Sequence, residues 1–99
     1  YDSYHYMVTY NHEEKEETVN IVGNICESGD ILARNRSLPK LHIGDVIGVR
    51  DAGAYGYSMS SNYNARLRPA EVLINRKEGT EKLIRRRETY EDLLSTMRL

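Results

Sequence analysis

Short runs rich in β-branched and aromatic residues recur along most of the chain and are separated by polar stretches. The first two runs are HYMVTY, residues 5–10, and TVNIVG, residues 18–23, with the polar segment NHEEKEE between them. Runs of this composition predict β-strands, and the polar segment predicts a solvent-exposed loop. We therefore expect these two strands to pair as a β-hairpin.

Further segments carry the same strand signals: residues 30–41, 46–50, 65–75 and 81–87. The first of them should be short and should lead into a turn that ends at Pro39, because proline cannot donate a hydrogen bond to a neighbouring strand. Pro69 places part of the 65–75 strand at a sheet edge or a bulge. The last strand should follow a turn at KEGT.

The C-terminal segment ETYEDLLSTM, residues 88–97, has a different pattern. Acidic residues open it, and helical spacing places four apolar side chains on one face: Tyr90, Leu93, Leu94 and Met97. This predicts a short helix that packs through a single stripe. Regularly spaced strands with one terminal helix predict a mainly β fold, either a β-barrel or a sandwich, in one domain.

Composition narrows the class of protein. The 14 Lys and Arg residues nearly balance the 15 Asp and Glu residues, which argues against a nucleic-acid or membrane partner selected by charge. No apolar run approaches the roughly 18 residues of a membrane span, and a single cysteine forms no internal disulfide, so we expect a cytoplasmic domain. Eight tyrosines and no Phe or Trp suit interfaces and pocket rims as much as a closed interior.

The only cysteine, Cys26, lies in the segment ICESGD. A single cysteine next to Ile25 fits a small buried hydrophobic residue. The polar neighbour Glu27 and the bracketing Gly23 and Gly29 instead favour an accessible loop. A carboxylate beside the thiol favours its protonated form, which donates a proton rather than attacking as a nucleophile.

A second polar segment is DAGAYGYSMSSNYN, residues 51–64. Its glycines, tyrosines and serines could form an anion cradle, or simply a turn into a short helix, and it lacks the Gly-Lys-Ser/Thr end of a P-loop. The histidines are scattered, so we expect no metal site. The arginines of residues 85–87 could bind phosphate, end a strand in solvent or pair with acids such as Glu88 and Glu91.

Residues 22–74 together with LIRRRETYEDLL, residues 83–94, closely resemble the C-terminal β domain of the diaminopimelate decarboxylase family. The opening YDSYHYM is similar to the family's junction between its two domains, so the resemblance covers essentially all 99 residues. CESGD, DAGAYG, NYN and RRRETYEDLL carry it together. These enzymes use pyridoxal 5'-phosphate (PLP) and combine an alanine-racemase-like barrel with this β domain.

The resemblance implies a head-to-tail homodimer in which each active site is shared between one subunit's barrel and the other's β domain. It implies that Cys26 reaches into the partner's site and protonates the substrate carbon after carbon dioxide leaves. Glu27 would bind the far amino group of meso-diaminopimelate, and Tyr55 would lie by substrate and cofactor, with its hydroxyl on the phosphate. Tyr63 and Asn64 also match a position beside the pocket.

The glutamate after the cysteine favours diaminopimelate, because the ornithine-type relatives carry aspartate there. The product would then be L-lysine. Two alternatives remain open: a stand-alone, non-catalytic dimerisation or binding module, and the β domain of a decarboxylase of a polyamine pathway.

The family's barrel, with its PLP-binding lysine, phosphate-binding glycines and substrate arginines, has no counterpart in this sequence. We therefore expect residues 1–99 to be the C-terminal β domain alone and to be inactive in isolation. The lysines are expected at the surface, and none matches the family's Schiff-base motif.

Overall fold

The computed structural model describes residues 3–98, so Tyr1 and Asp2 of the junction motif lie outside the described residues. The chain divides into two compact units, residues 1–59 and residues 60–99. The first unit contains strands β1 (Met7–Thr9), β2 (Glu16–Val22), β3 (Ile31–Pro39) and β4 (Ile47–Val49), and the 3-10 helix η1 (Tyr57–Met59). The second contains the 3-10 helix η2 (Tyr63–Ala65), strands β5 (Glu71–Asn75) and β6 (Thr80–Arg85), and helix α1 (Tyr90–Leu93).

In the first unit, β1 pairs with β4 in antiparallel fashion, with Met7 opposite Val49. The pairing extends beyond the strand ends, because Arg50 N donates to Tyr6 O at 2.8 Å. The expected hairpin between residues 5–10 and 18–23 is therefore wrong. The acidic segment between them does not form a hairpin loop, since β2 already begins at Glu16 within it.

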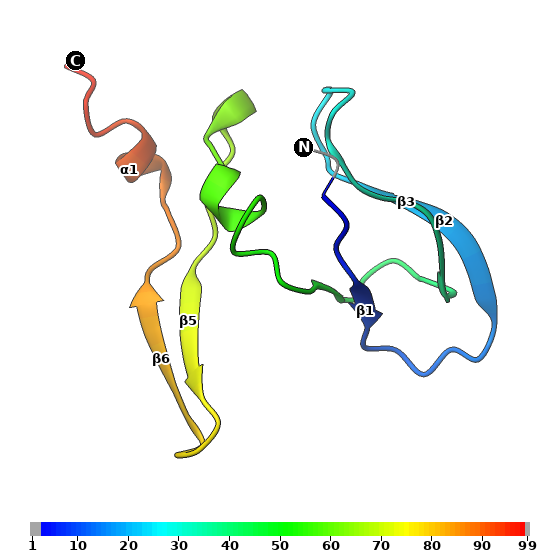
Figure 1. Cartoon of the computed structure of the whole chain (residues 1–99). Helices are drawn as coiled ribbons and strands as arrows, with labels where there is room; N and C mark the ends of the chain where they lie inside the picture. The colour runs from blue at the N-terminus through cyan, green and yellow to red at the C-terminus, as the bar shows by residue number, and fades with distance from the viewer. Residues whose placement is uncertain (1–2, 99) are drawn as a thin grey trace. The chain divides into compact units, whose positions relative to one another are not determined.

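The strands β2 and β3 form the longest antiparallel pair, and Figure 1 shows them as one curved ribbon that closes at the 23–30 loop. The expectation that residues 30–41 form a short strand before a turn is wrong, because β3 is nine residues long and includes Pro39. Pro39 is its last residue and lies opposite Glu16, at the end of the ladder where proline is tolerated. Ala33 and Leu38, which are 4% and 7% exposed, are the buried apolar residues among those described.

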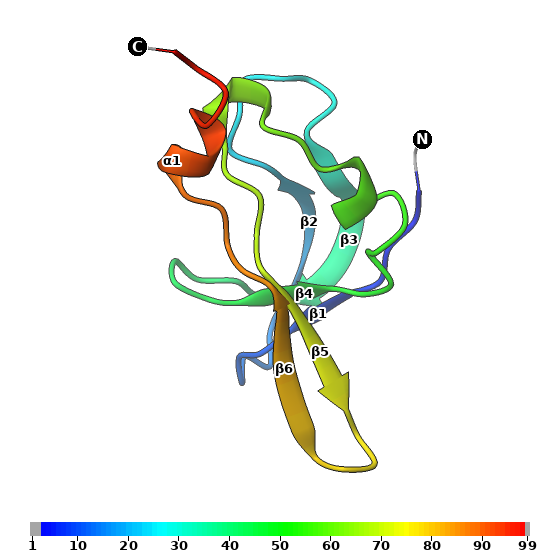
Figure 2. The same cartoon turned by 90° about the vertical axis from the view of Figure 1, so that its left-hand side faces the viewer.

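In the second unit, β5 and β6 form a hairpin with Asn75 opposite Thr80, drawn as a long two-stranded arm in Figure 2. Asn75 Oδ1 accepts hydrogen bonds from the backbone N–H groups of Lys77 and Glu78, and Gly79 closes the turn with a φ of 65°. The expected turn at KEGT is confirmed. The strand expected from residue 65 begins only at Glu71, so Pro69 precedes it.

Helix α1 spans one turn, from Tyr90 to Leu93, and is much shorter than the expected 88–97 helix. Most of its apolar stripe is exposed: Tyr90 is 66% exposed and Met97 is 56% exposed, whereas Leu93 is half-buried. A helix this short gains little from its own hydrogen bonds, so its stability depends on the side chains that hold its first turn.

The fold class is confirmed at the level of a mainly β chain with one short α-helix. Within residues 3–98 the strands form three antiparallel sheets of two strands each, rather than one continuous sheet. The functional side chains expected from the sequence lie on the connections between these strands.

Candidate functional site

The loop between β2 and β3, residues 23–30, carries Cys26 and is closed by Asp30. Gly23 N donates to Asp30 O at 2.9 Å, and Ile25 N donates to the Asp30 carboxylate at 3.2 Å. A Cβ atom at Gly23 would lie only 1.9 Å from Asp30 Oδ2, so the carboxylate occupies the space that any larger residue would need. Glycine at position 23 therefore leaves room for the Asp30 carboxylate to close the loop.

Cys26 lies at the exposed side of this loop, which confirms the accessible-loop interpretation over the buried one. The carboxylate of Glu27, the next residue, accepts a hydrogen bond from Gly29 N within the same loop. A carboxylate has about four acceptor positions, so this bond fixes the side chain and leaves acceptor capacity for a ligand. The loop thus presents a thiol and an anchored carboxylate side by side in the sequence.

Tyr55 belongs to the compact segment after β4. Tyr57 N donates to Ala52 O at 2.7 Å, and Tyr55 N donates to the Ser58 hydroxyl at 3.2 Å. Gly56 permits this close approach, because a Cβ atom there would lie 2.2 Å from Ala52 O. The segment is an ordered turn that leads into η1. This agrees with one of the two interpretations of its sequence, a turn into a short helix.

The backbone of Tyr55 is left-handed, with a φ of 61°, and its side chain is 60% exposed. A left-handed tyrosine is uncommon and costs on the order of 1 kcal/mol, so the surrounding hydrogen bonds must impose it. In Figure 1 this segment and the 23–30 loop occupy different parts of the first unit. Tyr55 and Cys26 thus lie on separate connections of the first unit, Cys26 between β2 and β3 and Tyr55 between β4 and η1.

Tyr63 and Asn64 lie in η2, in the second unit, and their turn is also left-handed: φ is 57° at Asn64 and 58° at Ala65. The turn is fastened to the segment before α1. Glu88 Oε1 accepts from Asn62 Nδ2 at 2.8 Å and from Arg68 N at 2.7 Å. One carboxylate oxygen thus holds the residues on both sides of the turn.

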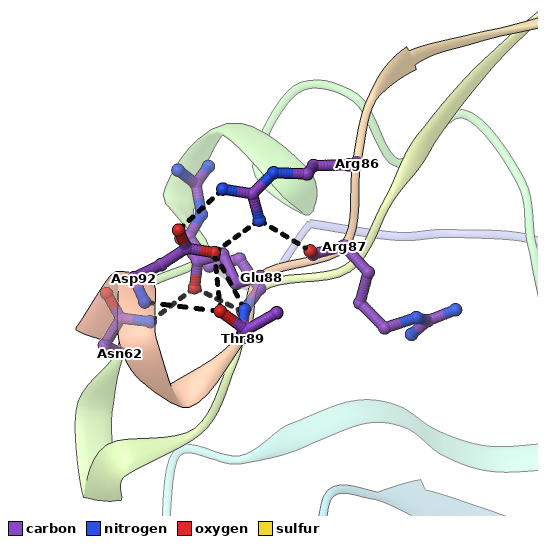
Figure 3. A network of polar contacts seen from close by, with 7 residues as sticks. Asn62, Arg86, Arg87, Glu88, Thr89 and Asp92 are labelled. Carbon is purple, nitrogen blue, oxygen red and sulfur yellow. Dashed lines mark hydrogen bonds and ion pairs between the residues drawn. The ribbon is translucent and has the colours of Figure 1, made fainter. Parts of the chain in front are cut away.

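Figure 3 shows the polar network around this junction. Arg86 forms a two-point pair with Asp92, with Nη2 lying 2.6 Å from Oδ1. Asp92 also accepts from Thr89 N at 2.8 Å, while the Thr89 hydroxyl accepts from Asp92 N, which is a capping box at the start of α1. The three residues fix the single helical turn to the end of β6.

The network holds two carboxylates in their charged forms. The guanidinium of Arg86, followed by the Thr89 backbone N–H, lowers the pKa of Asp92 well below its ordinary value. Hydrogen bonds from the Arg68 backbone and the Asn62 amide lower the pKa of Glu88. Both groups are therefore anions at neutral pH and act as permanent acceptors.

The sequence did not predict this network in detail. Two of its arginines pair with acids, as one interpretation of residues 85–87 predicted, but the expected partners Glu88 and Glu91 are wrong. Arg86 forms an ion pair with Asp92, and Arg85 forms one with Glu71 at 2.7 Å. The spacing of Thr89 and Asp92 is the sequence signal that could have located the cap. No local pattern marks Asn62 as the partner of Glu88, because 26 residues separate them.

His5 and His42 form ordinary polar contacts. His5 Nδ1 lies 3.0 Å from Arg50 O, and His42 Nε2 lies 3.1 Å from the Glu13 carboxylate, which lowers the pKa of Glu13. Among residues 3–98, no three His, Cys, Asp or Glu side chains gather closely enough to hold a metal ion. None of the helices in that range has the length and apolar character that a membrane crossing needs.

Cys26, Glu27 and Tyr55 place a thiol, a carboxylate and a phenol on connections between the strands. This arrangement is typical of a domain that presents side chains to a ligand. The family model for the pyridoxal-dependent decarboxylase C-terminal sheet domain matches residues 1–53, more than half of the chain. The chain therefore belongs to this family.

Known proteins of the same kind match the chain over nearly its whole length. It is 49% identical over 96 residues to the diaminopimelate decarboxylase of Methanothermobacter thermautotrophicus, covering 95% of this chain and 22% of that protein. It is 52% identical over 101 residues to the enzyme of that name from Archaeoglobus fulgidus, covering 100% of this chain and 24% of that protein.

A solved structure agrees with these sequences. The crystal structure of diaminopimelate decarboxylase from M. jannaschii in co-complex with L-lysine matches with a TM-score of 0.90 and 44% identity, over 100% of this chain and 22% of that one. The chain thus spans between a fifth and a quarter of the length of these relatives.

Proposed function

We propose that residues 1–99 are the C-terminal β domain of a PLP-dependent diaminopimelate decarboxylase, which converts meso-2,6-diaminopimelate to L-lysine and carbon dioxide. The observation that carries this proposal is the near-complete coverage of the chain by relatives of that name at 49% and 52% identity. The L-lysine in the co-complex of the M. jannaschii enzyme is the product that such a reaction would release.

In this proposal Cys26 is the proton donor. When the carboxyl group leaves the substrate as carbon dioxide, the carbon that carried it keeps the bonding electron pair. The Cys26 Sγ–H supplies the proton that completes the new C–H bond, and the resulting thiolate regains a proton from water. The exposed position of Cys26 on a loop closed by Asp30 supports this role, because the thiol can reach a site outside its own chain.

Glu27 would select the substrate by binding the ammonium group at its far end. The hydrogen bond from Gly29 N fixes the carboxylate in advance, so binding the ammonium costs less side-chain entropy. A charge-assisted hydrogen bond at the end of the substrate far from the reacting carbon would orient one stereocentre toward Cys26.

The residues of this chain fit only a small part of a PLP site. The Tyr55 phenol, exposed and held by a left-handed backbone, is the side chain that would donate a hydrogen bond to the phosphate and contact the substrate. When bound, PLP supplies the electron sink for decarboxylation. The lysine that would hold it would belong to the barrel proposed for the full-length protein, outside residues 1–99.

The remaining parts of the proposal concern the full-length protein. We place an N-terminal barrel before this domain, a second subunit that receives Cys26 and Glu27, and the assembly in the cytoplasm. Closure of the strands into a β-barrel or sandwich likewise stays a proposal for the full-length protein.

The test is the full-length protein supplied with PLP and meso-diaminopimelate, with carbon dioxide and L-lysine as the readouts and ornithine as a comparison substrate. We expect turnover of diaminopimelate, and a loss of about 10²–10³-fold in kcat for Cys26→Ala. Ser28→Ala, a change on the same loop, is the matched control and should leave kcat within about 2-fold. Full turnover by Cys26→Ala would remove the assigned proton donor.

A further inference from the structure

The β2–β3 pair is interrupted along its length by a β-bulge, the first of two register shifts along β2. Val19 lies opposite Arg36 and Ile21 lies opposite Ala33, so that one residue of β2, Asn20, faces two residues of β3. An extra residue on one strand bends the pair and increases its local twist. The curvature of the paired strands is visible in Figure 1.

The bulge places the buried residues of β3 on one face of the pair. Ala33 and Leu38 are 4% and 7% exposed, although they are five positions apart in the strand. In an uninterrupted strand, residues an odd number of positions apart point to opposite faces. The extra residue shifts the alternation by one, so loss of the bulge would turn one half of β3 over relative to the other.

Two asparagines form the bulge. Asn35 has a left-handed backbone, with a φ of 51°, and asparagine adopts this conformation more readily than most residues. Its backbone N–H donates to the Asn20 Oδ1 atom on the opposite strand at 2.8 Å. Both asparagines are exposed, so neither contributes a side chain to the core. The Asn20 side chain thus ties the bulged residue to β2.

The half of the pair on one side of the bulge is attached to the segment before β1. Arg36 Nη1 donates to His5 O at 2.6 Å, and the guanidinium carbon lies 3.7 Å from the centre of the Tyr4 ring. His5 is joined in turn to the residue after β4, since its Nδ1 atom lies 3.0 Å from Arg50 O. This half therefore has a defined anchor within the first unit.

The half on the other side of the bulge ends in the Cys26 loop. The loop begins at Gly23, three residues beyond Asn20, which is about 10 Å along the strand. A rotation of about 20° at the bulge, comparable to the twist between neighbouring strands, moves the start of the loop by about 3–4 Å. A misplacement of about 1 Å can lower the rate of a reaction about 10²-fold. The bulge therefore sets the direction in which the loop extends from the anchored half.

We propose that Asn20 is a positioning residue, which holds the bulge at Asn35 so that the loop aims the Cys26 thiol at the substrate carbon. This inference rests on the proposed function, since it concerns the proton that Cys26 donates. Asn20 acts through the loop, by fixing the bend of the strands that carry it.

The experiment uses the full-length protein supplied with PLP and meso-diaminopimelate. It measures kcat, the solvent deuterium isotope effect on kcat, and the melting temperature. Asn20→Ala removes the acceptor of the Asn35 N–H. We expect kcat to fall about 10–10²-fold, with a larger solvent isotope effect, because proton transfer from Cys26 becomes rate-limiting. The melting temperature should change little, since Asn20 is exposed.

Conservative variants and controls separate positioning from stability. Asn20→Asp keeps an acceptor oxygen, and Asn35→Gly introduces a residue that adopts a left-handed backbone freely, so both should keep kcat within about 3-fold. Thr18→Ala, at an exposed position in the regular part of β2, is the matched control. Leu38→Val weakens the core and should lower the melting temperature while leaving kcat within about 2-fold.

A Cys26→Ala background shows whether Asn20 acts through this thiol. There, Asn20→Ala should reduce kcat no further, because both changes remove the same proton transfer. A further loss of about 10-fold in that background would contradict the inference, since Asn20 would then act elsewhere.

Two other results would also overturn it. A normal kcat for Asn20→Ala would show that the bulge aims nothing, and an equal loss of kcat in Leu38→Val would make the effect one of stability alone. An unaltered full-length protein that does not decarboxylate diaminopimelate would instead refute the proposed function, and this inference with it.

Discussion

The conformation of the Cys26 loop depends on a contact between two residues, Gly23 and Asp30. The Asp30 carboxylate accepts from Ile25 N and fills the space where a Cβ atom at position 23 would lie. The sequence predicted a glycine-bracketed loop with an accessible thiol, and both are confirmed. It could not predict that Asp30 closes the loop, because this depends on which of several nearby acids turns inward.

Gly23→Ala should therefore open the Cys26 loop. The new methyl group displaces the Asp30 carboxylate, and the hydrogen bond to Ile25 N is lost, at a cost of about 1–2 kcal/mol. In the full-length protein, hydrogen–deuterium exchange of the peptide covering residues 22–31 should accelerate about 10-fold. Gly53→Ala is the matched control, since a Cβ atom there meets nothing within 4 Å.

A double-mutant cycle separates this steric cause from a general weakening. In an Asp30→Ala background, Gly23→Ala should add almost nothing, because the clashing carboxylate is gone. Equal effects of Gly23→Ala in both backgrounds would show that the loop is closed by something other than Asp30.

At the scale of elements, local patterns located the strands but not their partners. The β5–β6 hairpin was predictable, because its turn residues lie between its two strands in the sequence. The pairing of β1 with β4 was not, since about 40 residues separate Met7 from Val49 and no local signal selects between β2 and β4. Helix α1 was placed correctly but its length was overestimated, because apolar spacing alone does not show whether a stripe is buried.

The single turn of α1 should depend on the charge of Asp92. The folded protein lowers the pKa of Asp92 from its ordinary value of 3.8, chiefly through the hydrogen bonds from Arg86. A carboxyl group with a depressed pKa contributes stability above its ordinary pKa, and the contribution disappears as the pH falls through the depressed value. The cap should therefore hold from neutral pH down to about pH 4 and weaken only in stronger acid.

Arg86→Gln removes the largest cause of that shift. An NMR titration of the Asp92 carboxyl carbon in the full-length protein should show its midpoint rise toward the ordinary value. Arg87→Gln is the matched control, since Arg87 contributes its backbone carbonyl to Arg86 and not its side chain to Asp92. An unchanged midpoint in Arg86→Gln would mean that the Thr89 cap alone holds the carboxylate.

At the scale of the whole chain, apolar surface is left uncovered. In β5, Val72 and Ile74 alternate with Leu73, so apolar side chains lie on both faces of the β5–β6 hairpin, and all three are more than half exposed. Tyr4, Tyr6 and Tyr10 add to this surface, since each is at least 65% exposed. What covers it could not be read from the sequence, because the relatives are four to five times longer than this chain.

The isolated 99-residue chain should therefore be marginally stable and prone to self-association. Two-stranded sheets are at best marginal in water, and only Ala33 and Leu38 are buried apolar residues within 3–98. We expect strong binding of a hydrophobic dye and a sedimentation coefficient that rises with concentration, while the full-length protein shows neither.

Leu73→Lys together with Ile74→Lys should reduce dye binding of the isolated chain, with Lys82→Arg on the paired strand as the control. A monomeric chain that binds no dye and unfolds cooperatively at high temperature would mean that the exposed surface needs no cover from the rest of the protein.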